Sequence, residues 1–343
     1  MAETDTSGHD AMLWEALDGQ KVRCRLCGHE CVIAAGKYGI CQVRRNVEGQ
    51  LKSLSYSNVV SLNVDPIEKK PLFHFLPGTQ SVSVAAGGCN FQCEFCQNWQ
   101  ISQGPRAGGL KGQAISPAQI VTAAVNYDCA SISYTYTEPT VFFELAYDTA
   151  QLARAKGIKN CFVSNGFMTP LAVEKIAPVL DAINVDLKAF RDETYRQIMK
   201  ARLAPVLECL KALVEAGVWV EVTTLVVPGM NDTPEELSEI AGFIASELGS
   251  HVPWHVSRFH GDYKMTSIPS TPMETLQLAC ELGRQAGLKY IYCGNVSGLV
   301  DERTLCPACG AVVIDRAGFA VRSVNLDEGK CPKCGQLIEG IWD

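Results

Sequence analysis

The sequence lacks the features that mark membrane, secreted and repetitive proteins. It has no run of eighteen apolar residues, which excludes a helix that spans a membrane by its hydrophobicity. Its start, MAETDTSGHDAM, is acidic and polar and has no signal-peptide pattern. There is no solenoid-type repeat and no low-complexity tract. We therefore expect a globular protein of the cytoplasm.

An excess of basic residues is also missing. The chain has 30 lysines and arginines against 37 aspartates and glutamates, a net charge of −7. This balance argues against nucleic acid and against an anionic membrane surface as partners. The 343 residues, 47% hydrophobic and 20% charged, are enough for one large domain or for a barrel-sized domain with small additions.

Cysteine, in contrast, is abundant. Disulfides are disfavoured in a reducing compartment, so clustered cysteines among the sixteen indicate metal binding. The clusters are Cys24, Cys27, Cys31 and Cys41; Cys89, Cys93 and Cys96; and Cys306, Cys309, Cys331 and Cys334. The scattered cysteines, which we expect to be buried core residues, are Cys129, Cys161, Cys209, Cys280 and Cys293.

The middle of the chain alternates between strand and helix patterns. Strands are expected at 81–86, 131–136, 160–165, 182–188, 218–227, 254–259 and 289–294. Helices are expected at 116–128, 139–157, 169–180, 205–216, 231–248 and 271–287. Repeated β–α units with apolar strands predict an α/β fold with a parallel sheet, and six or so units favour a curved, partial barrel over a flat sheet. The sequence alone leaves both forms open.

Three domains follow from these patterns. We expect an N-terminal four-cysteine metal-binding extension at 1–75, the barrel at 76–300 and a four-cysteine ribbon at 301–343. Function in such barrels collects at the C-terminal ends of the strands. Four chemically rich stretches stand there: the three-cysteine segment, YTEP, SNG and DLK.

The segment GGCNFQCEFCQNWQ raises the question of why three cysteines come together without a fourth. Three thiolates satisfy three irons of a [4Fe–4S] cube and leave one iron open to an exchangeable ligand. Gly87 and Gly88 let the backbone approach such a cluster closely. The alternative is a three-cysteine zinc site completed by His74, the nearest histidine in the sequence.

The C-x3-C-x2-C spacing, with Phe95 before the last cysteine, resembles the radical S-adenosylmethionine (radical SAM) superfamily. The resemblance implies a partial (β/α)6 barrel in which Cys89, Cys93 and Cys96 are catalytic and hold a [4Fe–4S] cluster. It also implies that the open iron binds S-adenosylmethionine and that an electron donor such as ferredoxin or flavodoxin reduces the cluster. Cleavage of the cofactor then gives a 5′-deoxyadenosyl radical that takes a hydrogen atom from a substrate.

Further motifs resemble the cofactor-binding strand ends of this superfamily. The stretch TYTEP stands where the superfamily usually has two glycines and a glutamate, which implies a contact between Glu138 and the cofactor ammonium group. A solvated glutamate that caps the next helix is the alternative. The missing glycines leave the local backbone geometry open. The residues implied to contact the cofactor are Phe95, Gln97, Thr137, Glu138, Asn165, Asp186, Lys188 and His255.

Two of these contacts come from a resemblance to pyruvate formate-lyase activating enzyme, in SNG at 164–166 and DLK at 186–188. That resemblance implies that Lys188 contacts the cofactor carboxylate, with Asp186 beside it. His255 or His260 is implied to face the ribose. Asn165 and His255 are equally well explained as structural polar residues.

The full length resembles the radical SAM component of the AmmeMemoRadiSam set, through CRLCGHEC…GICQVR, GGCNFQCEFCQNWQIS and YTYTEPT. The set is named for two companion families, so companion proteins are implied as partners. The target is left open between a partner protein, as for the activating enzymes, and a small molecule. A non-catalytic electron-transfer or metal-binding protein is the alternative from another class.

The two outer cysteine groups each suit a closed metal site. The N-terminal four favour zinc, an iron–sulfur cluster is the rival, and His29 is a possible substitute ligand. The knuckles CPACG and CPKCG favour a zinc ribbon, with a rubredoxin-like iron site as the alternative. A short tail without a core needs such a metal to fold.

Overall fold

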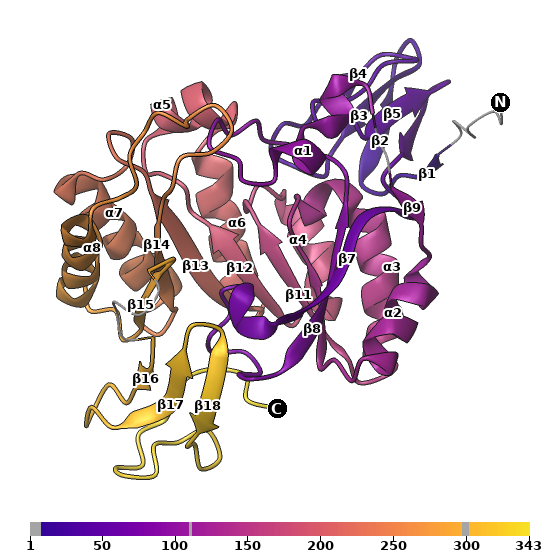
Figure 1. The fold of residues 1–343 in the computed structure, drawn as a ribbon. Helices are drawn as coiled ribbons and strands as arrows, with labels where there is room; N and C mark the ends of the chain where they lie inside the picture. The colour runs from indigo at the N-terminus through magenta and orange to yellow at the C-terminus, as the bar shows by residue number, and fades with distance from the viewer. Residues whose placement is uncertain (1–7, 110–111, 297–301) are drawn as a thin grey trace.

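The computed structural model of the chain describes residues 8–109, 112–296 and 302–343. Residues 1–7 of the acidic start, and residue 301 of the predicted ribbon, lie outside the described residues. A single nine-stranded sheet forms the centre, with an N-terminal subdomain at one end and a small antiparallel sheet at the other (Figure 1).

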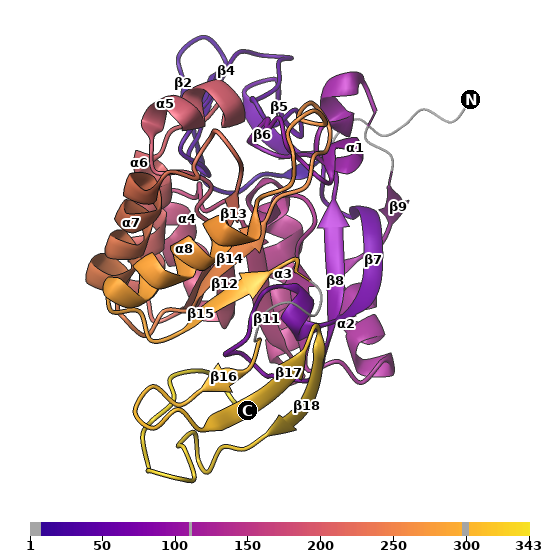
Figure 2. The same ribbon diagram turned by 60° about the vertical axis from the view of Figure 1, so that its left-hand side comes forward.

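Seven neighbouring strands of the central sheet are parallel. They are β8 (Gln80–Ala86), β10 (Ser131–Tyr134), β11 (Lys159–Ser164), β12 (Ala182–Asp186), β13 (Trp219–Val226), β14 (Trp254–Arg258) and β15 (Ile291–Gly294). Two antiparallel strands, β7 (Asn58–Pro66) and β9 (Gln113–Ala114), extend the sheet beyond β8. Since β15 and β9 are its edges, the curved sheet stays open (Figure 2). The predicted α/β partial barrel is confirmed.

Helices connect the parallel strands and cover the outer face of the sheet (Figure 1). They are α2 (Pro117–Asn126), α3 (Phe143–Arg154), α4 (Pro170–Ile176), α6 (Ala204–Glu215), α7 (Pro234–Phe243) and α8 (Met273–Gln285). Ser116 caps α2 through a reciprocal capping box with Gln119, as the Ser-Pro start predicted. The short helices α1 (Trp99–Ser102) and α5 (Asp192–Thr194) lie in loops above the strand ends.

The N-terminal region forms two small three-stranded sheets. One contains β1 (His9–Asp10), β6 (Gln50–Ser53) and β5 (Arg44–Val47), and the other β2 (Trp14–Leu17), β3 (Lys21–Cys24) and β4 (Val32–Ile33). Because β7 pairs with β8, the central sheet begins before residue 76. The division of the chain at residues 75 and 300 stays a prediction.

The tail forms a three-stranded sheet of β16 (Thr304–Leu305), β17 (Val312–Ala317) and β18 (Ala320–Val324). It is joined to the barrel by a backbone bridge between Phe75 and Ile341. The guanidinium group of Arg316 is buried and donates to Thr304 Oγ1 at 2.7 Å and to the carbonyl oxygen of Phe73. The tail is therefore attached by polar contacts as well as by its apolar core.

Apolar side chains from the helices and the sheet form the main core. The five scattered cysteines are all buried, as expected. In the described part of the chain, no helix is both long enough and apolar enough to cross a membrane.

Candidate active site

The three-cysteine loop leaves the end of β8 through a turn that requires glycine. Gly88 has a φ of +110°, and a Cβ atom there would lie 2.9 Å from Val43 Cγ1. The left-handed conformation and the lack of space both exclude a larger residue. The turn therefore packs closely against the N-terminal subdomain.

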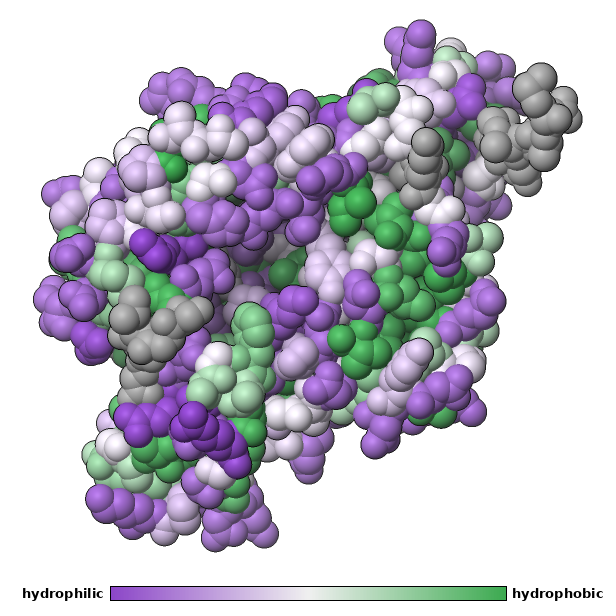
Figure 3. Space-filling model, viewed as in Figure 1, coloured by the Kyte–Doolittle hydropathy of each residue, from purple (hydrophilic) through white to green (hydrophobic). Residues whose placement is uncertain are grey.

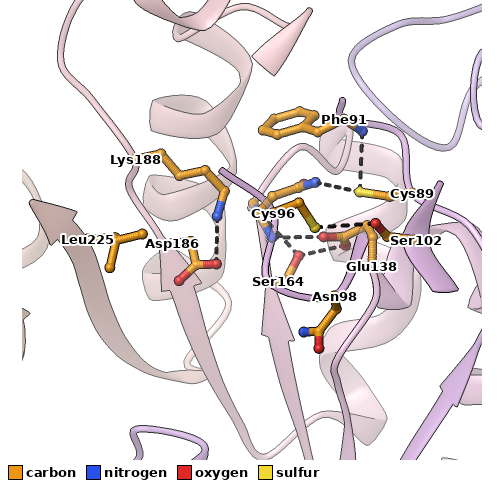
Figure 4. Close-up of polar contacts among 12 residues, drawn as sticks. Cys89, Phe91, Cys96, Asn98, Ser102, Glu138, Ser164, Asp186, Lys188 and Leu225 are labelled. Atoms are coloured by element: carbon orange, nitrogen blue, oxygen red, sulfur yellow. Dashed lines mark hydrogen bonds and ion pairs between the residues drawn. The ribbon is translucent and has the colours of Figure 1, made fainter. Parts of the chain in front are cut away.

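Each end of the loop has a polar contact to one of its sulfur atoms. Cys89 Sγ accepts a hydrogen bond from the Phe91 amide at 3.3 Å, and Cys96 Sγ lies 3.3 Å from Ser102 Oγ (Figure 4). Burial raises the pKa of Cys93 to about 12 and also raises that of Cys89 well above its usual range. The free thiols are thus neutral, and a bound metal would displace their protons.

Glu138 lies beneath the loop and is buried. Its carboxylate accepts hydrogen bonds from Thr140 N, Thr140 Oγ1 and Ser164 Oγ on one oxygen and from Asn165 N on the other. Burial raises its pKa, which these hydrogen bonds oppose. Glu138 therefore caps the turn that follows it, as the alternative expected, but it is buried rather than solvated. The carboxylate oxygen that accepts from Asn165 N has the capacity to accept a further hydrogen bond.

Asn165 connects the end of β11 to the cysteine loop. Its Nδ2 donates to Asn90 Oδ1 at 2.7 Å and lies 3.8 Å from Cys89 Sγ. Its Oδ1 accepts from the Phe167 amide at 3.2 Å. The amide nitrogen of this side chain thus contacts the cysteine loop, and its oxygen holds the turn that follows β11.

Lys188 and Asp186 form an ion pair of 2.8 Å at the end of β12 (Figure 4). Burial alone would lower the pKa of Lys188, but Asp186 and the nearby Cys93 outweigh it, so the pKa is raised. The ammonium group also lies 5.9 Å from the ring centroid of Phe95. The chain thus holds a fixed positive charge beside the cysteine loop.

The histidines that the sequence analysis considered for the central site have their hydrogen bonds with groups other than the cysteine sulfurs. His255 Nε2 is 2.6 Å from Glu221 Oε2, and its ring stacks on Tyr292. His74 uses both ring nitrogens, on the carbonyl of Glu339 and the hydroxyl of Tyr292, so it is not available to complete a three-cysteine zinc site. His260 reaches the loop only through Gln97, at 3.1 Å between side-chain nitrogens.

One cavity of about 1260 Å³ collects these groups. It opens as a hollow on the concave side of the sheet (Figure 3). Its lining includes His255 but not His260, the alternative to it, and all the other residues predicted for the central cluster and its cofactor: Cys89, Cys93, Phe95, Cys96, Gln97, Thr137, Glu138, Asn165, Asp186 and Lys188. These residues come from five strands of the sheet or from the loops that follow them, and most stand at the carboxyl ends of the strands, as expected for a barrel.

Comparison with known proteins agrees with this geometry. The sequence pattern of the family described as "Radical SAM superfamily" matches residues 84–244, which hold the loop and about half of the residues that line the cavity. The chain belongs to the radical SAM superfamily. An uncharacterized protein of Methanocaldococcus jannaschii is 48% identical over 96% of this chain and 98% of its own length.

More distant relatives within the radical SAM superfamily have named activities. The benzylsuccinate synthase activating enzyme of Thauera aromatica is 21% identical over 57% of this chain and 65% of its own length. The pyruvate formate-lyase-activating enzyme of Clostridium pasteurianum is 23% identical over 58% of this chain and 87% of its own length. This chain is a radical SAM enzyme similar to such activating enzymes.

Solved structures show the same fold. A radical SAM methyltransferase from Sphaerobacter thermophilus superposes with a TM-score of 0.51 at 15% identity, over 64% of this chain and 67% of its own. Streptococcus suis SuiB bound to S-adenosylmethionine also gives 0.51 at 15% identity, over 68% of this chain and 53% of its own. At this identity the likeness shows the radical SAM fold alone.

Radical SAM enzymes use a [4Fe–4S] cluster and S-adenosylmethionine, and the residues present fit both. Three thiols suit a cube with one open iron, and the fixed charge of Lys188 suits a carboxylate. The cavity extends past the loop to Tyr292 and the ribbon, which leaves space beyond the thiols.

The tail cysteines form the second candidate metal centre. Cys306 and Cys334 have sulfur atoms 3.6 Å apart, and those of Cys309 and Cys331 are 3.7 Å apart. Thiolates bound tetrahedrally to one zinc ion at about 2.3 Å lie about 3.8 Å apart. The four cysteines are thus arranged to bind one metal ion.

Two features of the site were missed by the sequence interpretation. Tyr136 has a φ of +63°, in the stretch where the superfamily usually carries glycine, and its hydroxyl donates to Asp65 while Asn98 donates to its carbonyl. The ribbon also lines the cavity, through residues of β17 and β18 such as Asp315, Arg316 and Arg322. The missing glycines of TYTEP were a signal for the unusual backbone of Tyr136. No local sequence pattern indicates that the ribbon lines the cavity.

Proposed function

We propose that Cys89, Cys93 and Cys96 each bind one iron of the cluster and that the cavity beside them binds S-adenosylmethionine and the substrate. When bound, the [4Fe–4S] cluster supplies an electron that cleaves S-adenosylmethionine, and the resulting 5′-deoxyadenosyl radical abstracts hydrogen from the substrate. The observation that carries the proposal is that all eleven residues predicted for cluster and cofactor line one cavity.

The surrounding residues have separate roles in this proposal. The amide of Phe91 and the side chain of Asn165 hydrogen-bond to Cys89 and tune the charge on its sulfur. Lys188 binds the cofactor carboxylate, held in place by Asp186. Glu138 fixes the loop of Asn165 and offers its second oxygen to the cofactor ammonium group.

The substrate side of the cavity is bounded by the ribbon and by His255. Contacts with Glu221 and Tyr292 fix the orientation of the His255 ring, and the residue is buried. We assign it to orientation of the cofactor ribose or the substrate.

We further propose a partner protein as the target, because the named relatives are activating enzymes. A ferredoxin or flavodoxin would supply the electron, and AmmeMemo companion proteins are candidate partners. EPR of an anaerobic mixture of the enzyme, cofactor and candidate partner tests this point. A glycyl radical supports a protein target, and turnover of a metabolite without that radical supports a small-molecule target.

The test of the chemistry itself is anaerobic reconstitution, reduction with dithionite and assay for 5′-deoxyadenosine. Cys96→Ala should abolish the product, because two thiolates retain a cluster poorly. Cys129→Ala is the matched control, since Cys129 is buried and lies outside the cavity. Visible clusters without 5′-deoxyadenosine in the native chain would instead indicate an electron-transfer protein.

A further inference from the structure

The four N-terminal cysteines have no role in the proposed function, and the structure brings them together. Cys24 ends β3, and Cys27, Cys31 and Cys41 follow in the loops before β5. All four line one cavity, together with apolar side chains and with Arg44 and Asn90. Four thiols around one cavity have the composition of a metal centre.

The spacing of these sulfur atoms differs from that of the tail. Among the residues that the structure describes, the tail cysteines are the one group of metal-binding side chains whose ligand atoms all lie within 4.8 Å of one another. The N-terminal four do not meet this limit, and neither do Cys89, Cys93 and Cys96. Thiolates on a single zinc ion would meet it, at about 3.8 Å apart. Thiolates on separate corners of a cluster are spread more widely, because each binds its own iron.

Buried donors at the cavity suit a negatively charged cluster. The Arg44 guanidinium is buried, donates to Cys24 Sγ at 3.4 Å and pairs with the buried Glu144. In the described part of the chain, Arg44 Nε and Asn90 Nδ2 are buried without a hydrogen-bond partner, and both residues line the cavity. Such N–H groups are the usual partners of cluster sulfurs.

The N-terminal site also adjoins the loop of the proposed catalytic cluster. His29 Nε2 lies 2.9 Å from the carbonyl oxygen of Asn90, the residue after Cys89. Arg106 donates to the carbonyl of Ile40 and, at 2.8 Å, to that of Cys89. The Asn90 side chain lines the N-terminal cavity and accepts from Asn165 beside Cys89. Asn90 thus contacts both sites.

We propose that Cys24, Cys27, Cys31 and Cys41 bind a second iron–sulfur cluster, of the four-iron type, rather than the zinc ion favoured by the sequence. Its assignment to electron transfer rests on the proposed function. A reduced one-electron donor protein of low potential gives one electron to this cluster, which is reoxidised as the electron passes to the cluster at Cys89, Cys93 and Cys96. No bond is made or broken at the N-terminal site.

The deciding experiment removes the central cluster and counts metals. The triple variant Cys89→Ala/Cys93→Ala/Cys96→Ala, purified and reconstituted without oxygen, should keep about four iron atoms per chain and a four-iron EPR signal after reduction. A triple variant with zinc in place of that iron overturns the proposal. So does one with neither metal at the N-terminal cysteines.

A complementary variant, Cys24→Ala/Cys41→Ala, should lose about half of the iron of the native chain and keep the central cluster, detected by an EPR change on addition of S-adenosylmethionine. Unchanged iron in a folded variant would contradict the proposal. Cys129→Ala/Cys209→Ala, which removes two buried cysteines outside every group, is the matched control and should keep all the iron. If the complementary variant does not fold, the triple variant still decides.

The same measurements separate the two proposals. If the proposed function fails, the native chain makes no 5′-deoxyadenosine while the triple variant still holds iron. If only the second cluster fails, product forms and the triple variant holds no four-iron cluster. With both correct, Cys24→Ala/Cys41→Ala should lower turnover at least tenfold with reduced ferredoxin as the donor and much less with dithionite.

Discussion

The cysteine loop at 89–96 and the ribbon at 302–343 present the same ligand atom in different surroundings. In the loop, three thiols line a cavity of about 1260 Å³ and are contacted by groups from other strand ends. In the ribbon, four thiols face one another, with all sulfur atoms within 4.8 Å. The first arrangement leaves a coordination position accessible and the second closes the site, which is the general difference between a catalytic and a structural metal centre.

The two regions nevertheless share a wall. Side chains of β17 and β18 line the same cavity as the loop, although the ribbon knuckles lie apart from it. A metal ion bound by the ribbon would therefore support a structure that lines the same cavity as the loop. The predictions below test whether the regions can be separated, beginning with the largest expected effect.

Loss of the ribbon metal should unfold the tail. In Cys331→Ala the tail loses one of four ligands, and structural metal binding is worth on the order of 10 kcal/mol to a small domain. Metal analysis should show one ion fewer per chain, and limited proteolysis should cleave after residue 302. Iron at the loop should remain in this variant. Cys209→Ala, which removes another buried thiol, should keep the ribbon metal, and an intact metal content in Cys331→Ala would refute the assignment.

Breaking the contact between ribbon and barrel should lower the free energy of unfolding by less than loss of the ribbon metal does, though still by a large amount. Arg316→Met leaves Glu68 buried without its cationic partner and removes donors to Thr304 and Phe73, so we expect a loss of roughly 3–5 kcal/mol. Chemical unfolding of the metal-loaded protein measures it. Arg322→Met is the control, because that side chain is 66% exposed and should change stability by less than about 0.5 kcal/mol. Equal stabilities of the two variants would show that the ribbon is not part of the core.

On the loop side, Lys188→Met should weaken binding of S-adenosylmethionine. A charge-assisted hydrogen bond is worth about 1.5–3 kcal/mol, which corresponds to roughly a 10- to 100-fold rise in the dissociation constant. The cluster and the ribbon metal should be unaffected. Titration followed by EPR measures the affinity, with Lys156→Met, an exposed lysine of the outer surface, as the control. Native affinity in Lys188→Met would remove this residue from the cofactor site.

Much of the fold could be predicted from local patterns. The strands were visible as apolar runs because both faces of a parallel sheet are buried, and α2 was marked by its Ser116-Pro117 start. The cysteine loop was found from its spacing alone. These features depend on neighbours in the sequence, so a sequence carries them directly.

What escaped prediction depends on distant contacts. Glu138 was expected in solvent if it served as a cap, yet residues of the next strand bury it. Tyr136 adopts a positive φ because Asp65 and Asn98, both remote in sequence, hold its side chain and carbonyl. Arg316 reaches Phe73 across 243 positions. A periodic pattern contains no information about such pairs.

The smallest expected effect, for a change of one pH unit, concerns the junction of ribbon and barrel. His74 binds the carbonyl of Glu339 and the hydroxyl of Tyr292, and burial lowers its pKa to about 4, while Glu221 opposes and Arg316 reinforces that shift. Between an ordinary pKa of about 6.5 and this value the unfolded chain binds more protons than the folded one. Stability should therefore be full above pH 6.5 and fall toward pH 4, by at most about 1.4 kcal/mol per pH unit. His74→Gln should flatten this slope, and an unchanged slope in His74→Gln would place the pH dependence elsewhere.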